Sequence, residues 1–171
     1  MKRVIRNEVW ETNSSSVHTL TFCGKKSMYY GMDVEQDGYV HSHFDDYGWY
    51  HEPLDDMYWR LSYILTMAAE IERRNETYHD EESFYQTESF KMIEDVVKEH
   101  VDCKGIKIDY NGIEMYQGKY GEYVVFNGFL DHQSWEDYNS LDDFLKDSGV
   151  DSIERFVFDY SVVMFIDNDN H

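Results

Sequence analysis

Residues 53–74 read PLDDMYWRLSYILTMAAEIERR, and this stretch decides the fold class of the chain. Its apolar positions recur with the spacing of one helical face. They are Leu54, Met57, Tyr58, Leu61, Ile64, Leu65, Ala68 and Ile71. Pro53 suits the first helical position, and the two aspartates that follow suit the first turn. The arginine pair at the end suits the last turn. We therefore predict a long amphipathic helix that begins at Pro53.

Further helices are predicted towards the C-terminus. Asp80 is a suitable N-cap for a second long helix, which we expect to end at Gly105. The positions expected to be buried in it are Phe84, Phe90, Ile93, Val96, Val97 and Val101. Ser140 and Asp151 resemble the first residues of capping boxes, so two short helices, LDDFLKDSG and SIERFVF, are expected after them.

The remaining apolar stretches have the alternation of strands. They are residues 2–11, 17–23, 37–44, 106–110, 113–117, 122–130 and 161–166. In the third stretch, His41 and His43 fall on the face opposite Val40 and Phe44. The Asn-Gly pair at 111–112 suits a hairpin turn, and we predict an antiparallel meander around it.

The predicted fold class is therefore α+β. An antiparallel sheet carries two long helices and one or two short helices. The chain has 171 residues, a length that suits a single domain over residues 1–171. Hydrophobic residues make up 42% of the chain and aromatic residues 17%, which is enough apolar area for an ordered core.

Charge is the strongest global property of the sequence. The formal net charge is −20. Residues 1–26 contain five basic and two acidic side chains, a net charge of +3, so the rest of the chain carries −23. Such a field repels nucleic acids and anionic membranes and attracts basic surfaces. We therefore expect a basic protein as the partner, with no direct binding of nucleic acid or membrane.

The cellular location is predicted from what the sequence lacks. The N-terminus has no apolar signal-peptide core, and no run approaches the ~18 apolar residues of a membrane span. The two cysteines, Cys23 and Cys103, form no C-x-x-C motif, which favours a reducing compartment. We expect a cytoplasmic protein without a cofactor.

The segment ETNSSSVHTL, residues 11–20, is the most unusual polar block. If the chain is extended there, Ser16 and His18 project to the same side about 6.6 Å apart, which permits a nucleophile and a base. No nucleophile elbow surrounds the serines, and no acid partner is identified. Two alternatives remain open, namely hydroxyl groups that close local turns and a loop that contacts a ligand through Asn13, Ser14 and Ser15.

Three further groups are candidate sites. The segment HSHFDDYGWYHE offers metal ligands, namely His41, His43, Asp45 and His51, although surface histidines explain the pattern equally. The other two groups, DHQS and the C-terminal tail, follow apolar strands, where loops often carry function. Their candidate residues are Asp131, His132 and Ser134 in DHQS, and Asp167 and Asp169 in the tail. A turn and a solvated terminus are the alternatives.

Carboxylates also gather on or beside the two long predicted helices. They are Glu70, Glu72, Glu81, Glu82, Glu88, Glu94, Asp95 and Glu99. Their simplest role is solubility. A sharper hypothesis is that a row of carboxylates imitates the phosphate spacing of nucleic acid and occupies a basic groove.

The serine block resembles the N-terminal E-T-N-S-S-S-x-H-S motif of uncharacterised small proteins encoded by phages and their Firmicute hosts. Weaker likeness extends to residues 47–49, 60–66 and 131–134 and to the Asn-Asp pair of the tail. Thr19 stands where Ser is usual, and an Asp pair replaces a Thr-Pro-Glu-Glu start of the first helix. The resemblance implies a phage origin and islands that meet in space, but it implies no reaction.

Two functional hypotheses follow. The first is an acidic phage-encoded protein that blocks a basic surface of a host nucleic-acid enzyme, as an anti-CRISPR or anti-restriction factor. The second is an enzyme or nucleotide-binding protein whose site combines the serine block, the DHQS segment and the tail.

Overall fold

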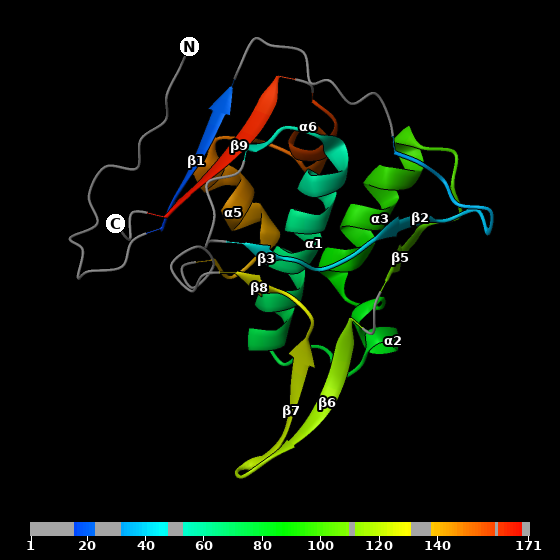
Figure 1. Cartoon of the computed structure of the whole chain (residues 1–171), viewed down its shortest axis with the longest axis vertical. Helices are drawn as coiled ribbons and strands as arrows, with labels where there is room; N and C mark the ends of the chain where they lie inside the picture. The colour runs from blue at the N-terminus through cyan, green and yellow to red at the C-terminus, as the bar shows by residue number, and fades with distance from the viewer. Residues whose placement is uncertain are drawn as a thin grey trace.

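A computed structural model of the chain describes residues 16–22, 32–47, 53–109, 112–130, 138–159 and 161–168. The helix predicted within residues 53–74 is α1 (Met57–Arg74), and it lies at the centre of the molecule (Figure 1). Three further helices pack around it: α3 (Glu88–His100), α5 (Leu141–Ser148) and α6 (Ile153–Phe158). Small sheets complete the structure, so the predicted α+β class is confirmed.

The start of α1 differs from the prediction. Pro53 and Leu54 form the short strand β4 (Pro53–Leu54) instead of the first helical turn. Asp56 is the N-cap, and its side chain accepts a hydrogen bond of 2.9 Å from the backbone N–H of Trp59. The predicted end at Arg74 is confirmed.

The polar side of α1 is also buried. Besides the predicted apolar stripe, Arg60, Ser62, Thr66, Glu70 and Glu72 are all nearly inaccessible to solvent. The expectation that Glu70 and Glu72 belong to an exposed acidic face is therefore wrong. The reason is that other elements cover this side of the helix too, and buried polar groups there find hydrogen-bond partners.

The second predicted helix is divided into α2 (Glu81–Phe84) and α3. The hydroxyl of Thr87 donates a hydrogen bond of 2.8 Å to the carbonyl of Phe84 and accepts one of 3.3 Å from the N–H of Phe90. One side chain thus ends α2 and caps α3. The predicted burial of Phe84, Phe90, Ile93 and Val97 is confirmed.

Each sheet is small. One is antiparallel, in the order β1 (Ser16–Phe22), β9 (Val162–Asn168), β4. Two are parallel pairs: β2 (Val40–Ser42) with β5 (Ile106–Ile108), and β3 (Asp46–Tyr47) with β8 (Phe129–Leu130). The fourth is the antiparallel pair β6 (Ile113–Gly118) and β7 (Gly121–Phe126).

The strand pairing differs from the predicted meander. Strand β5 pairs with β2, which lies far earlier in the sequence, and β6 pairs only with β7 among the described strands. The predicted alternation in β2 is confirmed, since Val40 and Ser42 are buried and His41 is half-buried between them. The strand predicted at residues 2–11 lies outside the described residues.

The two short helices are confirmed, with one shift of register. Ser140 N-caps α5 and accepts a hydrogen bond of 3.2 Å from the N–H of Asp143. Ser152, rather than the neighbouring Asp151, N-caps α6. Gly149 ends α5 with φ 74, in the left-handed region that glycine adopts most readily.

Candidate functional site

The serine block and the tail are neighbours at the level of the backbone. In the ladder between β1 and β9, Ser16 pairs with Asn168, Val17 with Asp167, and His18 with Ile166. This sheet thus brings the predicted candidates Ser16, His18 and Asp167 into adjacent strands. The other candidates of this set, Asn13, Ser14, Ser15, Asp131, His132, Ser134 and Asp169, lie outside the described residues.

Tyr47 and Ser62, which belong to two other segments that carry the resemblance, are in contact. The hydroxyl of Tyr47 donates a hydrogen bond of 2.8 Å to Ser62 Oγ, and Ser62 donates one of 2.7 Å to the carbonyl of His43. Burial raises the pKa of Tyr47 far above its ordinary value, so the phenol keeps its proton. These buried bonds hold the segment around β3 against α1.

His41 is held between two carboxylates. Its Nδ1 lies 2.8 Å from Asp109 Oδ1, and its Nε2 lies 3.2 Å from Asp37 Oδ2, which also accepts a hydrogen bond from Lys107. Burial alone would lower the pKa of His41, but the hydrogen bonds to Asp109 and Asp37 outweigh it and raise that pKa. Each ring nitrogen of His41 therefore lies within hydrogen-bond distance of a carboxylate oxygen.

His43 has a separate environment. Its Nδ1 lies 2.7 Å from the hydroxyl of Tyr58, its Nε2 lies 3.5 Å from Asp45 Oδ2, and its ring packs edge-on against Trp59. Among the described residues no group of three or more His, Cys, Asp or Glu has the arrangement of a metal site. His51 lies outside the described residues, so the metal site predicted from this segment stays a prediction.

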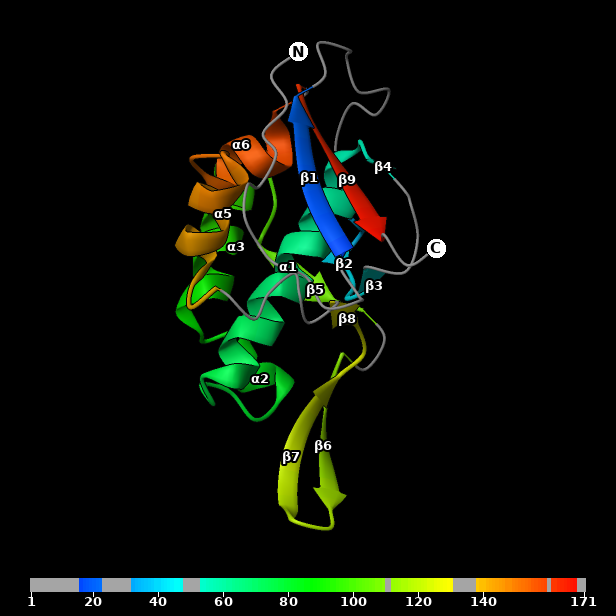
Figure 2. The same cartoon turned by 90° about the vertical axis from the view of Figure 1, so that its left-hand side faces the viewer.

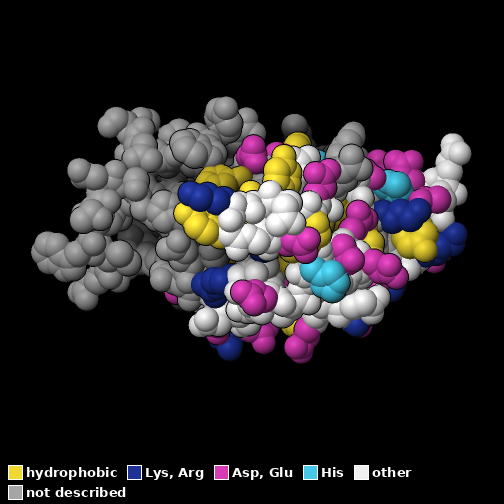
Figure 3. All heavy atoms as spheres, turned by 90° about the horizontal axis from the view of Figure 1, so that it is seen from below, with side chains coloured by type: hydrophobic (Ala, Val, Ile, Leu, Met, Phe, Trp, Pro, Cys, Tyr) yellow, Lys and Arg dark blue, Asp and Glu magenta, His cyan; other side chains and the backbone are white. Residues whose placement is uncertain are grey.

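Of the eight carboxylates predicted on or beside the two long helices, four are exposed. Glu94 forms an ion pair with Lys98 at 2.5 Å, and Glu81 accepts a hydrogen bond from the hydroxyl of Tyr85. Glu82, Glu88 and Asp95 are exposed and form no ion pair with another described residue. In the view of Figure 3, carboxylates are spread among other side chains instead of forming one continuous patch.

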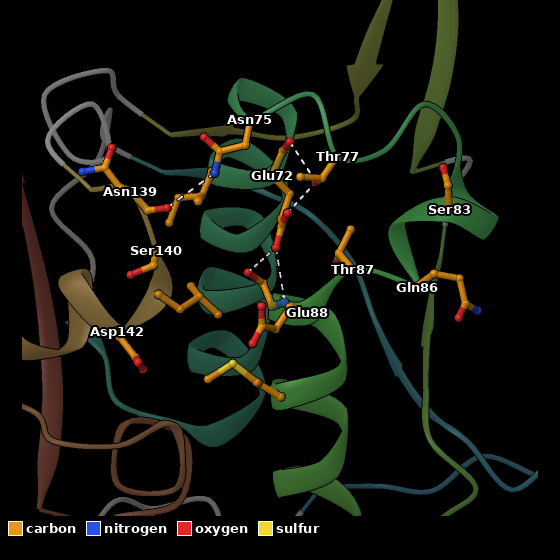
Figure 4. Close-up of a pocket in the computed structure, with 14 residues that line it drawn as sticks. Glu72, Asn75, Thr77, Ser83, Gln86, Thr87, Glu88, Asn139, Ser140 and Asp142 are labelled. Atoms are coloured by element: carbon orange, nitrogen blue, oxygen red, sulfur yellow. Dashed lines mark hydrogen bonds between the residues drawn. The ribbon is translucent and has the colours of Figure 1, made fainter.

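A pocket of about 620 Å³ lies where the end of α1 meets the beginnings of α3 and α5 (Figure 4). Its described lining combines hydroxyls, amides and carboxylates with apolar side chains, and it contains no Lys or Arg. The lining residues are Ile71, Glu72, Asn75, Thr77, Ser83, Gln86, Thr87, Glu88, Ser89, Met92, Asn139, Ser140, Leu141 and Asp142. This composition favours cationic or hydroxyl-rich groups over anions.

The carboxylate of Glu72 in this pocket is already engaged. It accepts hydrogen bonds from the backbone N–H and the hydroxyl of Ser89 and from the hydroxyl of Thr77. The remaining acidic groups of the lining are Glu88 and Asp142, which are exposed in the first turns of α3 and α5. The sequence singled out Glu88 but not Asp142, because only the fold brings α5 beside α3.

The hairpin β6–β7 projects from the body of the molecule (Figure 1, Figure 2). Its base is anchored, since Ile113 and Phe126 are buried and Phe126 contacts Phe44 edge-on at 5.2 Å. Beyond the base, large apolar side chains are exposed along both strands and just after them. They are Met115, Tyr116, Tyr120, Tyr123, Val125 and Phe129. Tyrosine is enriched at protein–protein interfaces, so the exposed tyrosines make the hairpin a candidate interaction surface.

Comparisons with known proteins assign no function to these features. The chain matches no protein-family model, no curated protein and no solved structure. None of the described helices has the length and apolar character that crossing a bilayer requires.

Proposed function

We propose that this chain is an acidic, phage-encoded binding protein that occupies a basic surface of a host nucleic-acid-handling enzyme, such as a CRISPR nuclease or a restriction complex. The exposed, unpaired carboxylates carry the proposal. Glu82, Glu88 and Asp95 on α2 and α3 are exposed, and none of them forms an ion pair with another described residue. A basic groove that binds phosphates also attracts carboxylates, because both groups are negatively charged. The serine-block resemblance supports the phage origin.

Several carboxylates of the chain do not contribute to this field. Glu70 is buried against Arg73, and Asp37 pairs with Lys107. Each of these ion pairs cancels one positive and one negative charge, so the formal net charge of the chain stays at −20. Association with a basic partner should therefore be fast and should weaken as salt rises, because exposed charges are screened beyond the Debye length.

Capture from host lysate tests the proposal. The neutral variant carries Glu82→Gln, Glu88→Gln, Asp95→Asn and Glu99→Gln, four exposed positions without an ion pair among the described residues. The matched control carries Glu82→Asp, Glu88→Asp, Asp95→Glu and Glu99→Asp, which keep the charge at the same positions. We expect the native protein and the control to retain a basic nucleic-acid enzyme at about 50 mM salt and release it at about 500 mM.

The neutral variant should retain that enzyme poorly at either salt concentration. The enzyme's activity on nucleic acid should be inhibited by the native protein and the control alone. Equal capture and equal inhibition by all three proteins would contradict the proposal.

One observation favours the alternative of an enzyme or nucleotide-binding protein. The ladder between β1 and β9 puts the backbones of Ser16 and His18 next to that of Asp167. Under this alternative, Ser16→Ala and His18→Ala abolish the biological effect of the chain, whereas the four neutral helix substitutions leave it unchanged. The proposed binding function predicts the opposite pattern in the same assay.

A further inference from the structure

The hairpin β6–β7 has an aromatic face that no described element covers. Tyr116 pairs across the ribbon with Tyr123, and their ring centroids lie 6.0 Å apart with an interplanar angle of 32°. The two side chains remain 54% and 51% exposed, although both belong to regular strands. Rigid aromatic groups held in solvent by backbone pairing are the residue type that dominates binding energy at interfaces.

A carboxylate shares this face. Glu114 lies two residues before Tyr116 in β6 and is paired with Val125, so strand alternation places it on the same side of the ribbon as the tyrosine pair. Glu114 is exposed and forms no ion pair with another described residue. Glu122 belongs to the opposite face, where it pairs with Gln117.

Other tyrosines of this chain already carry cations over their rings. Lys107 Nζ lies 4.4 Å from the ring centroid of Tyr39, and Lys119 Nζ lies 5.3 Å from that of Tyr120. No described Lys or Arg occupies the rings of Tyr116 or Tyr123. Two open aromatic rings beside an unpaired carboxylate match a planar cation, which stacks on a ring and donates hydrogen bonds to the carboxylate.

We propose that the face formed by Glu114, Tyr116 and Tyr123 binds an arginine side chain of a basic protein partner. The proposal rests on the proposed function for the basic character of that partner. It adds that the short-range contact is made by the hairpin, while the acidic helices supply the long-range attraction. Guanidinium is favoured over ammonium because it is planar, less strongly hydrated and able to stack and donate at once.

A titration with two peptides tests this inference. The probes are an acetylated Arg-Gly repeat peptide and its Lys-Gly counterpart, and binding is followed by NMR of the tyrosine ring signals and by calorimetry. We expect the arginine peptide to bind more tightly than the lysine peptide and to shift the ring signals of Tyr116 and Tyr123. Glu114→Gln should weaken binding of the arginine peptide by about 3-fold or more.

The matched control is Glu122→Gln, which removes one negative charge from the same hairpin but from its other face. Long-range attraction falls equally in both variants, so the difference between them isolates the local contact. A second pair of variants tests whether binding requires the aromatic rings or only apolar side chains at positions 116 and 123. Tyr116→Phe with Tyr123→Phe should keep arginine binding, whereas Tyr116→Leu with Tyr123→Leu should lose it while dispersed amide signals show that the protein remains folded.

Two results would overturn the inference. One is equal weakening by Glu114→Gln and Glu122→Gln, and the other is arginine binding by the folded leucine variant that matches the native protein. The proposed function is tested separately, because the neutral helix variant keeps the hairpin intact. If that variant loses its partner while the hairpin variants keep it, the proposed function stands and the hairpin inference fails.

Discussion

Ser89 donates two hydrogen bonds to one oxygen of Glu72, from its backbone N–H at 3.2 Å and from its hydroxyl at 2.5 Å. The other carboxylate oxygen accepts a hydrogen bond from the hydroxyl of Thr77. Glu72 lies in the last turn of α1 and Ser89 in the first turn of α3. The buried carboxylate therefore joins two helix ends beside the pocket, and it lies at the positive end of the α3 dipole.

Removing this carboxylate should destabilise the protein. Glu72→Ala leaves the backbone N–H and the hydroxyl of Ser89 without their acceptor, and we expect it to lower the free energy of unfolding by about 2–4 kcal/mol. Urea denaturation followed by circular dichroism measures the change. Asp95→Asn, an exposed substitution on α3, should stay within about 0.5 kcal/mol. Similar values for the two variants would contradict the structural role of Glu72.

Arg60 should be as sensitive as Glu72, although no carboxylate of the described residues forms an ion pair with it. It is fully buried, and its Nη1 donates to the carbonyls of Asp159 and Val162 at 2.8 and 2.6 Å. We expect Arg60→Lys to lower the free energy of unfolding by about 2 kcal/mol or more, because one ammonium nitrogen cannot replace both Nη1 and Nε, which donates to the carbonyl of Asp56 at 3.2 Å. Arg73→Lys, a half-buried control, should change stability by less than about 1 kcal/mol. Thermal denaturation in which Arg60→Lys unfolds no earlier than the control would exclude this role.

The His41 cluster predicts a pH dependence of stability. The pKa of His41 is raised in the folded protein, so its interaction with Asp109 and Asp37 is fully present below the unfolded value of about 6.5 and is lost as pH rises through the folded pKa. The native protein should therefore exceed His41→Gln in unfolding free energy most strongly near pH 6. The difference should shrink towards pH 9. A difference that is constant over this range, or that grows with pH, would show that His41 does not titrate as proposed.

Tyr47 and Ser62 should be energetically coupled. Their buried hydrogen bond of 2.8 Å continues through Ser62 to the carbonyl of His43. Tyr47→Phe and Ser62→Ala should each lower the unfolding free energy by about 1–2 kcal/mol, and a double-mutant cycle should give a coupling of about 0.5–1.5 kcal/mol. Tyr78→Phe combined with Ser62→Ala serves as a distant control that should be additive, because Tyr78 bonds to the carbonyl of Ala69 instead. Additivity in the first pair would contradict the bond.

Much of the local structure could be predicted from the sequence. The helix that ends at Arg74, the N-cap at Ser140 and the burial of Val40 in β2 depend on neighbours within a few residues. The break between α2 and α3 at Thr87 was missed, although Thr is a common N-cap, because the apolar pattern continues through it. Hydrophobic periodicity indicates which residues suit a core, but it does not reveal a single N-cap residue that divides one helix into two.

The candidate site was less predictable. Glu72 and Glu82 look alike in the sequence, yet one is buried against Ser89 and the other is exposed. The pocket depends on α5 lying beside the start of α3, and the hairpin is exposed because β5 pairs with β2 instead of with β6. None of these relations leaves a local signal in the chain.

The sequence by itself determined the α+β class, the central helix and the strong negative charge, because helical periodicity, capping and composition are properties of short segments and of residue counts. Only the tertiary structure decided which carboxylates meet solvent, which tyrosines stay uncovered and which strands pair. Those outcomes depend on contacts between residues far apart in the chain, and most buried polar groups are stable because the fold supplies a hydrogen-bond partner.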